Sequence, residues 1–383
     1  MKLSMYVLEA INKQNQSVLL NTVTQKYLPL DSSEITLRRN FFLAGQERDA
    51  VISAIDGWGV GDRLQLQVAP TWECNLRCTH CIVADRLKKR DNNVLDIVGL
   101  RDFVSRFVAA YQTKKILLGF YGAEPLMDVA ACQTVVDSIK SLGLPIECSL
   151  VTNLAMDLTP QHIALLSEMI GIGISLDGVE QNHNAQRIPA EGNVNTFRAT
   201  LHNMKVLVLA GLKDKLFIKT CLRQNFQTTE DYKDFMRTVM QFGIPQKAIS
   251  LGMMVPTKNL PEPTEVYLEV LQTSKLSASS CCRYRTHVIL VDNTNSIFSD
   301  FYGYTKLGTI YDSIDFLREQ QTNLTMQTSP ILNDPKCQNC QVIGYCWGGC
   351  YMHSVAKPFS VNCNQVGLIK HVTDAAASGA LFQ

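Results

Sequence analysis

Three cysteines lie close together in the segment Cys74-Asn75-Leu76-Arg77-Cys78-Thr79-His80-Cys81. Their C-x3-C-x2-C spacing allows three thiolates to bind three irons of one [4Fe–4S] cube, so that the fourth iron has no protein ligand and can bind a small molecule. An electron-transfer ferredoxin normally supplies four cysteines, and a structural zinc site also takes four ligands. The missing fourth cysteine therefore predicts a metal cluster that takes part in chemistry.

The composition is that of a globular protein without a strongly charged partner. The chain has 383 residues, is 46% hydrophobic and carries a net charge of +1, which suits one large domain and a smaller one and predicts no nucleic-acid binding. No apolar run is long enough to cross a membrane, and the first residues lack the apolar region of a secretion signal, so we expect a cytoplasmic protein. An odd number of cysteines, 13, indicates metal or redox chemistry rather than a framework made only of disulfides.

Hydrophobic periodicity divides the chain into three regions. In residues 1–63, the strand-like runs Ser4–Ala10 and Ser17–Leu28 predict a hairpin, and Glu47–Ile55 predicts a helix. Residues 64–275 alternate strands with helices such as Leu100–Tyr111 and Thr196–Ala210. The strands expected there are Leu64–Ala69, Lys115–Phe120, Ile146–Val151, Ile170–Leu176, Leu216–Leu222 and Ile249–Met254. Residues 276–383 are loop-rich and hold seven of the cysteines.

The alternation predicts an α/β fold. Six strand–helix units favour a parallel sheet, which right-handed crossovers can curl into a partial barrel. Functional groups of such a sheet belong on the loops at the carboxyl ends of its strands. Cys74 follows the first strand, where this rule places a functional residue.

Three further motifs follow the next strands in order. Tyr121-Gly122-Ala123-Glu124-Pro125 follows the second strand, Thr152-Asn153 the third, and Ser175-Leu176-Asp177-Gly178 the fourth, with His183 and Arg187 close behind. Together with the cysteines, these motifs resemble those of the radical S-adenosylmethionine (SAM) superfamily. The alternative for the motif Tyr121-Gly122-Ala123-Glu124-Pro125 is an ordinary strand-to-helix turn with Pro125 at the start of the helix. The alternative for Arg187 is a solvated surface residue.

The resemblance implies a partial (β/α)6 TIM-type barrel and a cluster on Cys74, Cys78 and Cys81 whose open iron binds SAM. One electron would then cleave SAM, and the resulting 5′-deoxyadenosyl radical would take a hydrogen atom from the substrate. Glu124 would accept the SAM ammonium group, and His80 would pack near the adenine. The residues that the resemblance implies for cofactor binding are His80, Gly122, Ala123, Glu124, Pro125, Asn153, Ser175 and Arg187. The chain departs from the family pattern at Ala123 and Leu154, which replace glycines, and at Asn184, which replaces an aspartate.

A second group of cysteines lies near the C-terminus, in the pattern Cys337-x2-Cys340-x5-Cys346-x3-Cys350 followed by Cys363. A zinc ribbon is one explanation, because paired cysteines suit zinc. The pattern also resembles the SPASM domain of radical SAM enzymes, which carries auxiliary iron–sulfur clusters. That resemblance implies one cluster on Cys337, Cys340, Cys346 and Cys363. It assigns Cys350 to another cluster, together with Cys282 or Cys281.

Asp300 fits two registers of the SPASM pattern. In one register it occupies a cysteine position and binds iron through oxygen, and a carboxylate is a weaker ligand there than a thiolate. In the other register Ser299 takes that position, and Asp300 matches the general base of sulfatase-maturing relatives. A solvated turn residue is the third explanation.

The resemblance implies an enzyme that modifies peptides or proteins. The leading hypothesis is a radical SAM/SPASM maturase that crosslinks a ribosomally made precursor peptide through a C–C, C–S or C–O bond. It would use SAM, up to two auxiliary [4Fe–4S] clusters and an external electron donor of the flavodoxin or ferredoxin type, and the N-terminal hairpin would contact a leader peptide. The alternatives are an anaerobic sulfatase-maturing enzyme that oxidises Cys or Ser to formylglycine, and a non-catalytic electron-transfer protein.

Overall fold

The computed structural model describes residues 2–12, 14–24, 26–55, 62–87, 93–221, 226, 228–252, 288–300, 303–328 and 330–341. The chain divides into two compact units. The larger unit contains the described residues from 62 to 252 and from 288 to 317, and the smaller unit contains those up to 55 and from 318 onward. No helix in the described part is long and apolar enough to span a membrane.

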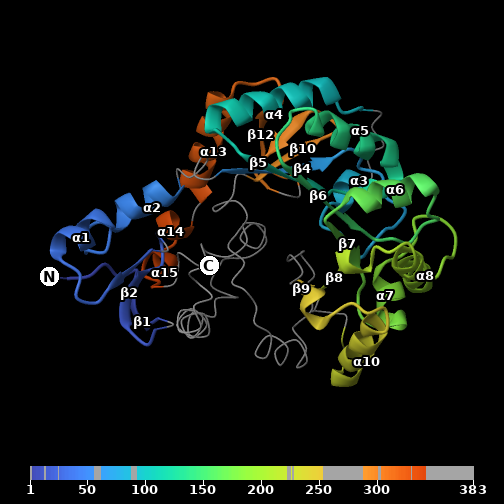
Figure 1. Ribbon diagram of the computed structural model, residues 1–383, viewed down its shortest axis with the longest axis horizontal. Coiled ribbons are helices and arrows are strands. Elements are labelled where there is room, and N and C mark those ends of the chain that lie inside the picture. The colour runs from blue at the N-terminus through green and yellow to red at the C-terminus, as the bar shows by residue number, and fades with distance from the viewer. Residues whose placement is uncertain are drawn as a thin grey trace. The chain divides into compact units, whose positions relative to one another are not determined.

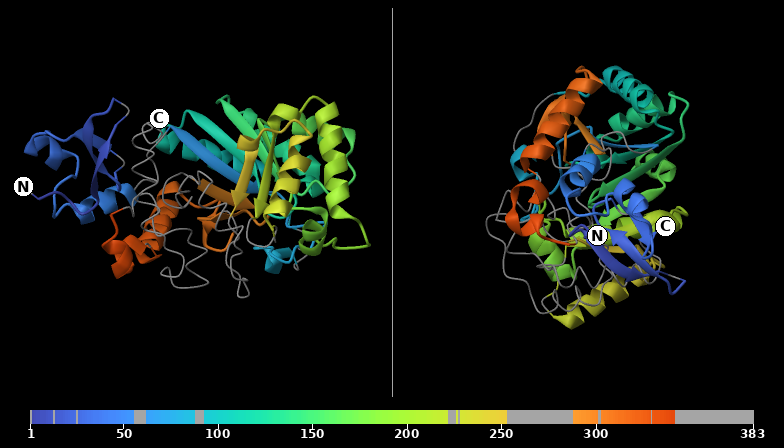
Figure 2. Two further views of the ribbon diagram at one scale, coloured as in Figure 1. Left: turned by 90° about the horizontal axis from the view of Figure 1, so that it is seen from below. Right: turned by 90° about the vertical axis from the view of Figure 1, so that its left-hand side faces the viewer.

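A large sheet forms the centre of the larger unit. Its described strands follow the order β12-β11-β10-β4-β5-β6-β7-β8-β9, and all pairs from β10 to β9 are parallel. In chain order, the first six strands of this sheet are β4 (Arg63–Ala69), β5 (Lys115–Phe120), β6 (Ile146–Thr152), β7 (Gly171–Ser175), β8 (Leu216–Cys221) and β9 (Ile249–Gly252). The left view of Figure 2 shows them side by side, from blue to yellow. The predicted α/β class with a parallel sheet is confirmed.

Helices cover the outer face of this sheet (Figure 1). The main ones are α4 (Ile97–Tyr111), α5 (Val129–Lys140), α6 (Pro160–Glu168), α8 (Thr196–Leu209) and α10 (Thr229–Met240). Each buries one apolar stripe; in α4 the stripe includes Phe103 and Phe107, which are fully buried. Helix α4 begins at Asp96, whose carboxylate accepts a hydrogen bond from the backbone N–H of Gly99 at 2.9 Å and so satisfies one of the open N–H groups of the first turn.

Small residues on the other face of the sheet let aromatic side chains lie flat on it. A Cβ atom on Gly173 of β7 would lie 2.8 Å from the ring of Phe217 on β8, which is closer than packed carbon atoms approach. The adjacent Ile172 and Ile174 point the opposite way and are fully buried, as the alternation of side chains along a strand requires.

Three strands from the C-terminal part of the chain extend the sheet. Strand β10 (Val288–Asp292) pairs in parallel with β4, and β11 (Ser296–Phe298) and β12 (Lys306–Thr309) continue it as an antiparallel meander. These strands belong to the region that the sequence assigned to the C-terminal domain. Periodicity identifies a short strand but not its partner, so this pairing was not predicted. The three domain boundaries themselves remain a prediction.

The smaller unit contains a three-stranded antiparallel sheet. Strand β1 (Val7–Ile11) pairs with β2 (Ser17–Asn21), which pairs with β3 (Lys26–Pro29). The run expected to be one strand, Ser17–Leu28, is thus two strands joined by a turn at residues 22–24. Among the described residues of this unit, the helices are α1 (Glu34–Arg39), α2 (Glu47–Ile55), α14 (Pro330–Asn333) and α15 (Pro335–Gln338), while α13 (Ile314–Thr328) begins in the larger unit.

Candidate active site

The three-cysteine loop lies at the carboxyl end of the parallel sheet, directly after β4. Backbone hydrogen bonds join it to the end of α7 (Glu180–Gln186) and to the residues that follow this helix. The N–H of Arg77 donates to the carbonyl of Ile188 at 2.7 Å, and the N–H of Thr79 donates to the carbonyl of Gln186 at 2.9 Å. The loop is therefore held along its length by a second loop at the same end of the sheet.

Polar hydrogens point at the sulfurs of the loop. The Sγ of Cys74 accepts from the N–H of Leu76 at 3.4 Å and from the side-chain amide of Asn153 at 3.8 Å. The Sγ of Cys78 lies 3.9 Å from Nη1 of Arg187. Donors of this kind stabilise a thiolate or a metal-bound sulfur.

Burial has the opposite effect on the metal-free thiols. Desolvation raises the pKa of Cys74 to about 12 and that of Cys78 to about 11, and it also raises the pKa of Cys81. No three His, Cys, Asp or Glu side chains of the described residues form ligands of one metal ion. In a [4Fe–4S] cube each thiolate binds a different iron, so a cube does not require three side chains around one metal ion.

A buried charge network lies beside the loop. Asp177, which follows β7, is fully buried and accepts a hydrogen bond from Nε of Arg187 at 2.6 Å, and the Nε2 of His80 lies 3.4 Å from the same carboxylate oxygen. Arg187 has only 11% of its side chain exposed. The interpretation of Arg187 as a solvated surface residue is therefore wrong: its guanidinium group joins Asp177 to Cys78.

Burial favours the neutral form of two histidines close to this network. Desolvation lowers the pKa of His80, and it lowers the pKa of His183 to about 3. The Nδ1 of His183 accepts the N–H of Asp177 at 3.1 Å, so His183 supports the loop after β7. The buried Nδ1 of His80 and Oε1 of Gln186 make no hydrogen bond of good geometry within the described structure, although the Gln186 side chain is close enough to oppose the lowering of the His80 pKa. Such orphaned polar atoms are costly unless a ligand or water satisfies them.

Glu124 lies at the end of β5 and is buried. Its two oxygens accept hydrogen bonds from the N–H of Asn153 at 2.7 Å and from the N–H of Leu126 at 3.2 Å. Desolvation, only partly offset by these hydrogen bonds, raises its pKa to about 7. The carboxyl group therefore joins the ends of β5 and β6, and near neutral pH its charge state depends on what binds beside it.

The Gly-Ala-Glu-Pro segment adopts the close-packed turn that its small residues predict. Gly122 has a φ of +128°, and a Cβ atom there would lie 2.8 Å from the Cβ of Ala69, so only glycine fits without displacing β4. Pro125 starts the short helix η1 (Pro125–Asp128), which Glu124 caps. Ala123 packs against the hydrophobic cluster behind the cysteine loop.

Leu154, after β6, has a backbone conformation that favours glycine. Leu154 has a φ of +55° and is fully buried. Hydrogen bonds from α8 hold this strained backbone: the Thr200 hydroxyl donates to the carbonyl of Asn153 at 3.0 Å, and the Asn203 amide donates to that of Leu154 at 2.9 Å. Asn153 also donates to Asn75 Oδ1 at 2.8 Å, so this segment helps to position the cysteine loop.

Asn184 carries out a structural task that an aspartate could not. Its Nδ2 donates to Asn195 Oδ1 at 3.0 Å, while its Oδ1 accepts from Thr196 Oγ1 at 3.0 Å and from the N–H of Phe197 at 2.9 Å.

Ser175, the last residue of β7, pairs in register with Lys219 of β8 and is half-buried at the carboxyl end of the sheet.

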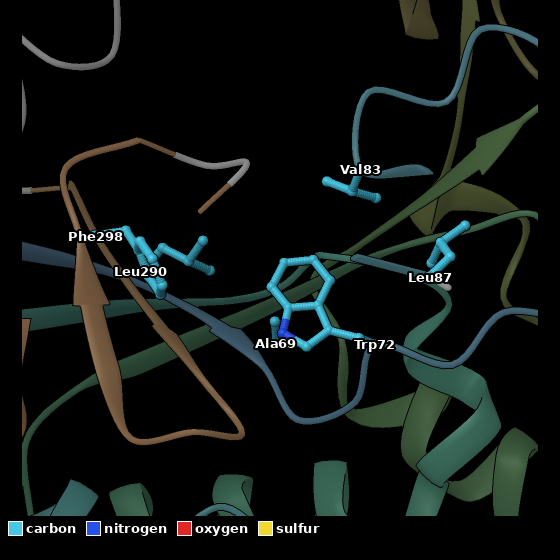
Figure 3. Packing of buried hydrophobic residues seen from close by; sticks show 6 residues of the cluster. All are labelled: Ala69, Trp72, Val83, Leu87, Leu290 and Phe298. Atoms are coloured by element: carbon cyan, nitrogen blue, oxygen red, sulfur yellow. The ribbon is translucent and has the colours of Figure 1, made fainter. Parts of the chain in front are cut away.

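A hydrophobic cluster packs behind the cysteine loop. Figure 3 shows Trp72 between Leu290 and Phe298 of the C-terminal strands on one side and Val83 and Leu87 on the other. Val83 precedes helix α3 (Ala84–Leu87), and Leu87 ends it. Cys74 and Cys81 pack against the same cluster. The guanidinium group of Arg86 lies 4.5 Å from the ring centre of Trp72 and 4.7 Å from that of Phe298, and donates to Asp292 Oδ2 at 3.1 Å. Arg86, on α3, thus joins the segment after the cysteine loop to β10 and β11.

Asp300 lies on the turn between β11 and β12. It is buried, and its carboxylate accepts the N–H groups of Tyr304 at 3.2 Å and Thr305 at 2.8 Å. The Tyr304 hydroxyl donates to the carbonyl of Ile82, which follows Cys81. A solvated position is therefore excluded, while the roles of iron ligand and general base remain predictions.

Only two of the C-terminal cysteines fall within the described residues. Cys337 lies in α15, and the N–H of Cys340 donates to its carbonyl at 3.1 Å. The other predicted ligands of the auxiliary clusters lie outside the described residues: Cys281, Cys282, Cys346, Cys350 and Cys363.

Comparisons with known proteins were made on sequence and on structure. No protein-family model and no curated protein matches the chain. Among solved structures, a histidine-tagged form of anSMEcpe with bound AdoMet is 18% identical and has a TM-score of 0.62, over 84% of this chain and 98% of that chain. Native anSMEcpe with bound AdoMet and Cp18Cys peptide is also 18% identical, with a TM-score of 0.61 and the same coverage. The chain has the fold of anSMEcpe. The resemblance inferred from the motifs is thus confirmed for the fold.

Proposed function

We propose that this chain is a radical SAM enzyme that oxidises a side chain of a peptide or protein. The observation that carries the proposal is the cysteine loop itself, in which sulfurs at the carboxyl end of the sheet face side-chain and backbone donors. The fold shared with AdoMet-bound anSMEcpe supports it. When bound, a [4Fe–4S] cluster and SAM would supply the 5′-deoxyadenosyl radical that takes a hydrogen atom from the substrate.

The described residues fit such a cofactor pair. Cys74, Cys78 and Cys81 would hold the cluster, while the Asn153 amide and the Arg187 guanidinium group would stabilise its sulfurs. Glu124 would receive the SAM ammonium group, since a nearby cation returns a buried carboxyl group to its charged form. The orphaned polar atoms of His80 and Gln186 suit a polar ligand beside the loop. Gly122, Ala123 and Pro125 would leave room for its backbone contacts, and Ser175 would contact its far end.

Crosslinking of a ribosomally made peptide remains the leading specific reaction. Hydrogen abstraction from a side-chain carbon would be followed by bond formation to a neighbouring side chain, with loss of one proton and one electron. An auxiliary cluster would accept the electron, and Asp300 is the candidate for the base unless it binds iron. The partners would be a precursor peptide and a flavodoxin-like or ferredoxin-like electron donor, in the cytoplasm.

One observation favours a second candidate, the anaerobic sulfatase-maturing reaction. Native anSMEcpe is described with AdoMet and Cp18Cys or Kp18Cys peptides, and this chain spans 98% of its length. Chain length therefore does not separate the two candidates. Both candidates require the same hydrogen abstraction and differ in what the oxidised side chain becomes.

Anaerobic reconstitution with iron and sulfide, followed by dithionite and SAM, tests the shared step. We expect 5′-deoxyadenosine from the wild-type protein and none from Cys81→Ala. Intact SAM in the wild-type reaction, with a cluster present and both peptide types added, would identify an electron-transfer protein instead. Mass spectrometry of the peptides then separates the reactions, because a crosslink between two side chains removes two hydrogens, whereas formylglycine formation from Cys also removes the sulfur.

A further inference from the structure

Two hydroxyl groups next to strands of the N-terminal sheet donate to backbone carbonyls beside the first C-terminal cysteine pair, Cys337 and Cys340. The phenol of Tyr6 donates to the carbonyl of Gln338 at 2.8 Å, and the hydroxyl of Thr22 donates to the carbonyl of Gln341 at 2.6 Å. More than 300 residues of sequence separate the partners in each pair, yet all four residues belong to the smaller unit. The two acceptor carbonyls lie on either side of Cys340.

The donors are rigidly held. Tyr6 is 5% exposed and Thr22 is fully buried, and the N–H of Thr22 donates to the carbonyl of Tyr6 at 2.9 Å. The Thr22 hydroxyl, which has a single proton, also lies 3.1 Å from this carbonyl, but the carbonyl of Gln341 is the nearer acceptor. The side chain of Asn21 accepts the N–H groups of Val23 at 2.9 Å and Thr24 at 3.1 Å, which forms the turn that presents Thr22. The sheet therefore offers two fixed donors rather than two mobile side chains.

The acceptors lie at the end of the short helix α15 and just after it. Asp334 caps α15 by accepting the N–H of Lys336 at 2.8 Å. This helix has four residues, too few to be stable alone. Removal of either hydroxyl would break the hydrogen bond that holds the neighbouring carbonyl, and so loosen the turn.

We infer that Tyr6 and Thr22 are positioning residues for Cys337 and Cys340, so that the N-terminal sheet is the structural base of an auxiliary-cluster site. The inference rests on the proposed function, because these cysteines are expected to bind a cluster only in a radical SAM enzyme of this type. It gives residues 1–55 a role at a redox centre, in addition to the predicted contact with a leader peptide.

The test compares variants that differ by one hydroxyl group. Tyr6→Phe and Thr22→Val remove the two donors. The control for Tyr6→Phe is Tyr27→Phe, at an exposed position. The control for Thr22→Val is Thr22→Ser, which keeps a hydroxyl group. In metal-free protein we expect Tyr6→Phe and Thr22→Val to raise the iodoacetamide alkylation rate of Cys337 and Cys340 about fivefold, the factor that corresponds to one ordinary hydrogen bond. Buried Cys132 and Cys148 serve as internal references, with alkylation of each cysteine followed by peptide mass spectrometry.

After anaerobic reconstitution, the same two variants should hold less iron than their controls but form as much 5′-deoxyadenosine, since the triad lies in the other unit. Unchanged alkylation and iron content in both variants would overturn the inference, as would an equal rise at Cys132 and Cys148, which would indicate general unfolding. Failure of the proposed function has a different result: no 5′-deoxyadenosine from any variant, wild type included, whatever the alkylation rates are.

Discussion

Leu154 shows how a single residue can be strained and stabilising at once. Its side chain is fully buried, but its backbone has a positive φ that costs a residue with a Cβ atom about 1 kcal/mol. Leu154→Ala should lose about 2–4 kcal/mol of unfolding free energy through the cavity it leaves. Leu154→Gly leaves a similar cavity but relieves the strain, so we expect it to be about 1 kcal/mol more stable than the alanine variant.

A matched control lies in α6. Leu165 is equally buried but helical, so Leu165→Gly should be about 1 kcal/mol less stable than Leu165→Ala. Urea unfolding followed by circular dichroism measures all four variants. The same order of glycine and alanine at both positions would contradict the explanation from backbone strain.

Glu124 should make the unfolding free energy depend on pH. Its pKa is raised from 4.5 to about 7 in the folded protein, so between these values the folded state holds a proton that the unfolded state has released. The wild-type protein should therefore lose up to about 3 kcal/mol relative to Glu124→Gln as the pH rises from 4.5 to 7. Urea unfolding at several pH values checks this, with Glu34→Gln at an exposed site as the control; a difference that does not change with pH would refute it.

Motif residues could be predicted at this scale, but their partners could not. The loop cysteines, Glu124 and Asn153 lie together at one end of the sheet, because the rule that functional groups follow parallel strands brings them there. Asp177 and Gln186 were not predicted as site residues, since nothing in a sequence shows that a carboxylate will be buried against Arg187. Asn75, which follows Cys74 directly, was not predicted as a residue that supports the cysteine loop, because its hydrogen bond with Asn153 joins segments far apart in the sequence.

At the scale of elements, Arg86 joins the cysteine loop to the C-terminal strands. Arg86→Gln would leave the buried carboxylate of Asp292 without its charged partner and remove two aromatic contacts, so we expect a loss of about 2–4 kcal/mol. The stability of Arg86→Lys should fall between those of the wild type and Arg86→Gln, because an ammonium group keeps the charge but not the flat stacking surface. Unfolding in urea measures the effect.

Arg101 provides the control for this prediction. It pairs with Asp102 at the surface, with 43% of its side chain exposed, so Arg101→Gln should change the free energy of unfolding by less than about 1 kcal/mol. Equal losses for Arg86→Gln and Arg101→Gln would show that the stacked arginine does not join the loop to β10 and β11.

The elements of the parallel sheet were predictable because each strand is a short apolar run bounded by turn residues. Lys115–Phe120 has the bounds predicted for it, and Glu47–Ile55 forms the predicted helix. The pairing of β10 with β4 was not predictable, because hydrophobic pattern is local and strand pairing is not. The third strand of the N-terminal sheet was missed for a simpler reason: Ser17–Leu28 has the pattern of one apolar run although it turns at residues 22–24.

At the scale of the whole molecule, iron should divide between the two units. If the triad binds one cube and the C-terminal cysteines bind others, Cys74→Ala/Cys78→Ala/Cys81→Ala should lose about four irons per chain and keep the remainder. Iron and sulfide analysis after anaerobic reconstitution measures this. Loss of all iron in the triple variant would contradict separate sites, and Asp300→Ala should lower the iron count only if that carboxylate is a ligand.

The position of β10 has a consequence for the growing chain on the ribosome. Strand β4 is complete at Ala69, but the strand that covers its open edge begins at Val288. Until translation reaches that point, the open edge of β4 exposes unpaired N–H and C=O groups, which can form hydrogen bonds with strands of other chains. Productive synthesis should therefore depend on chaperones that shield this edge, and release of the chain before Val288 should yield insoluble protein.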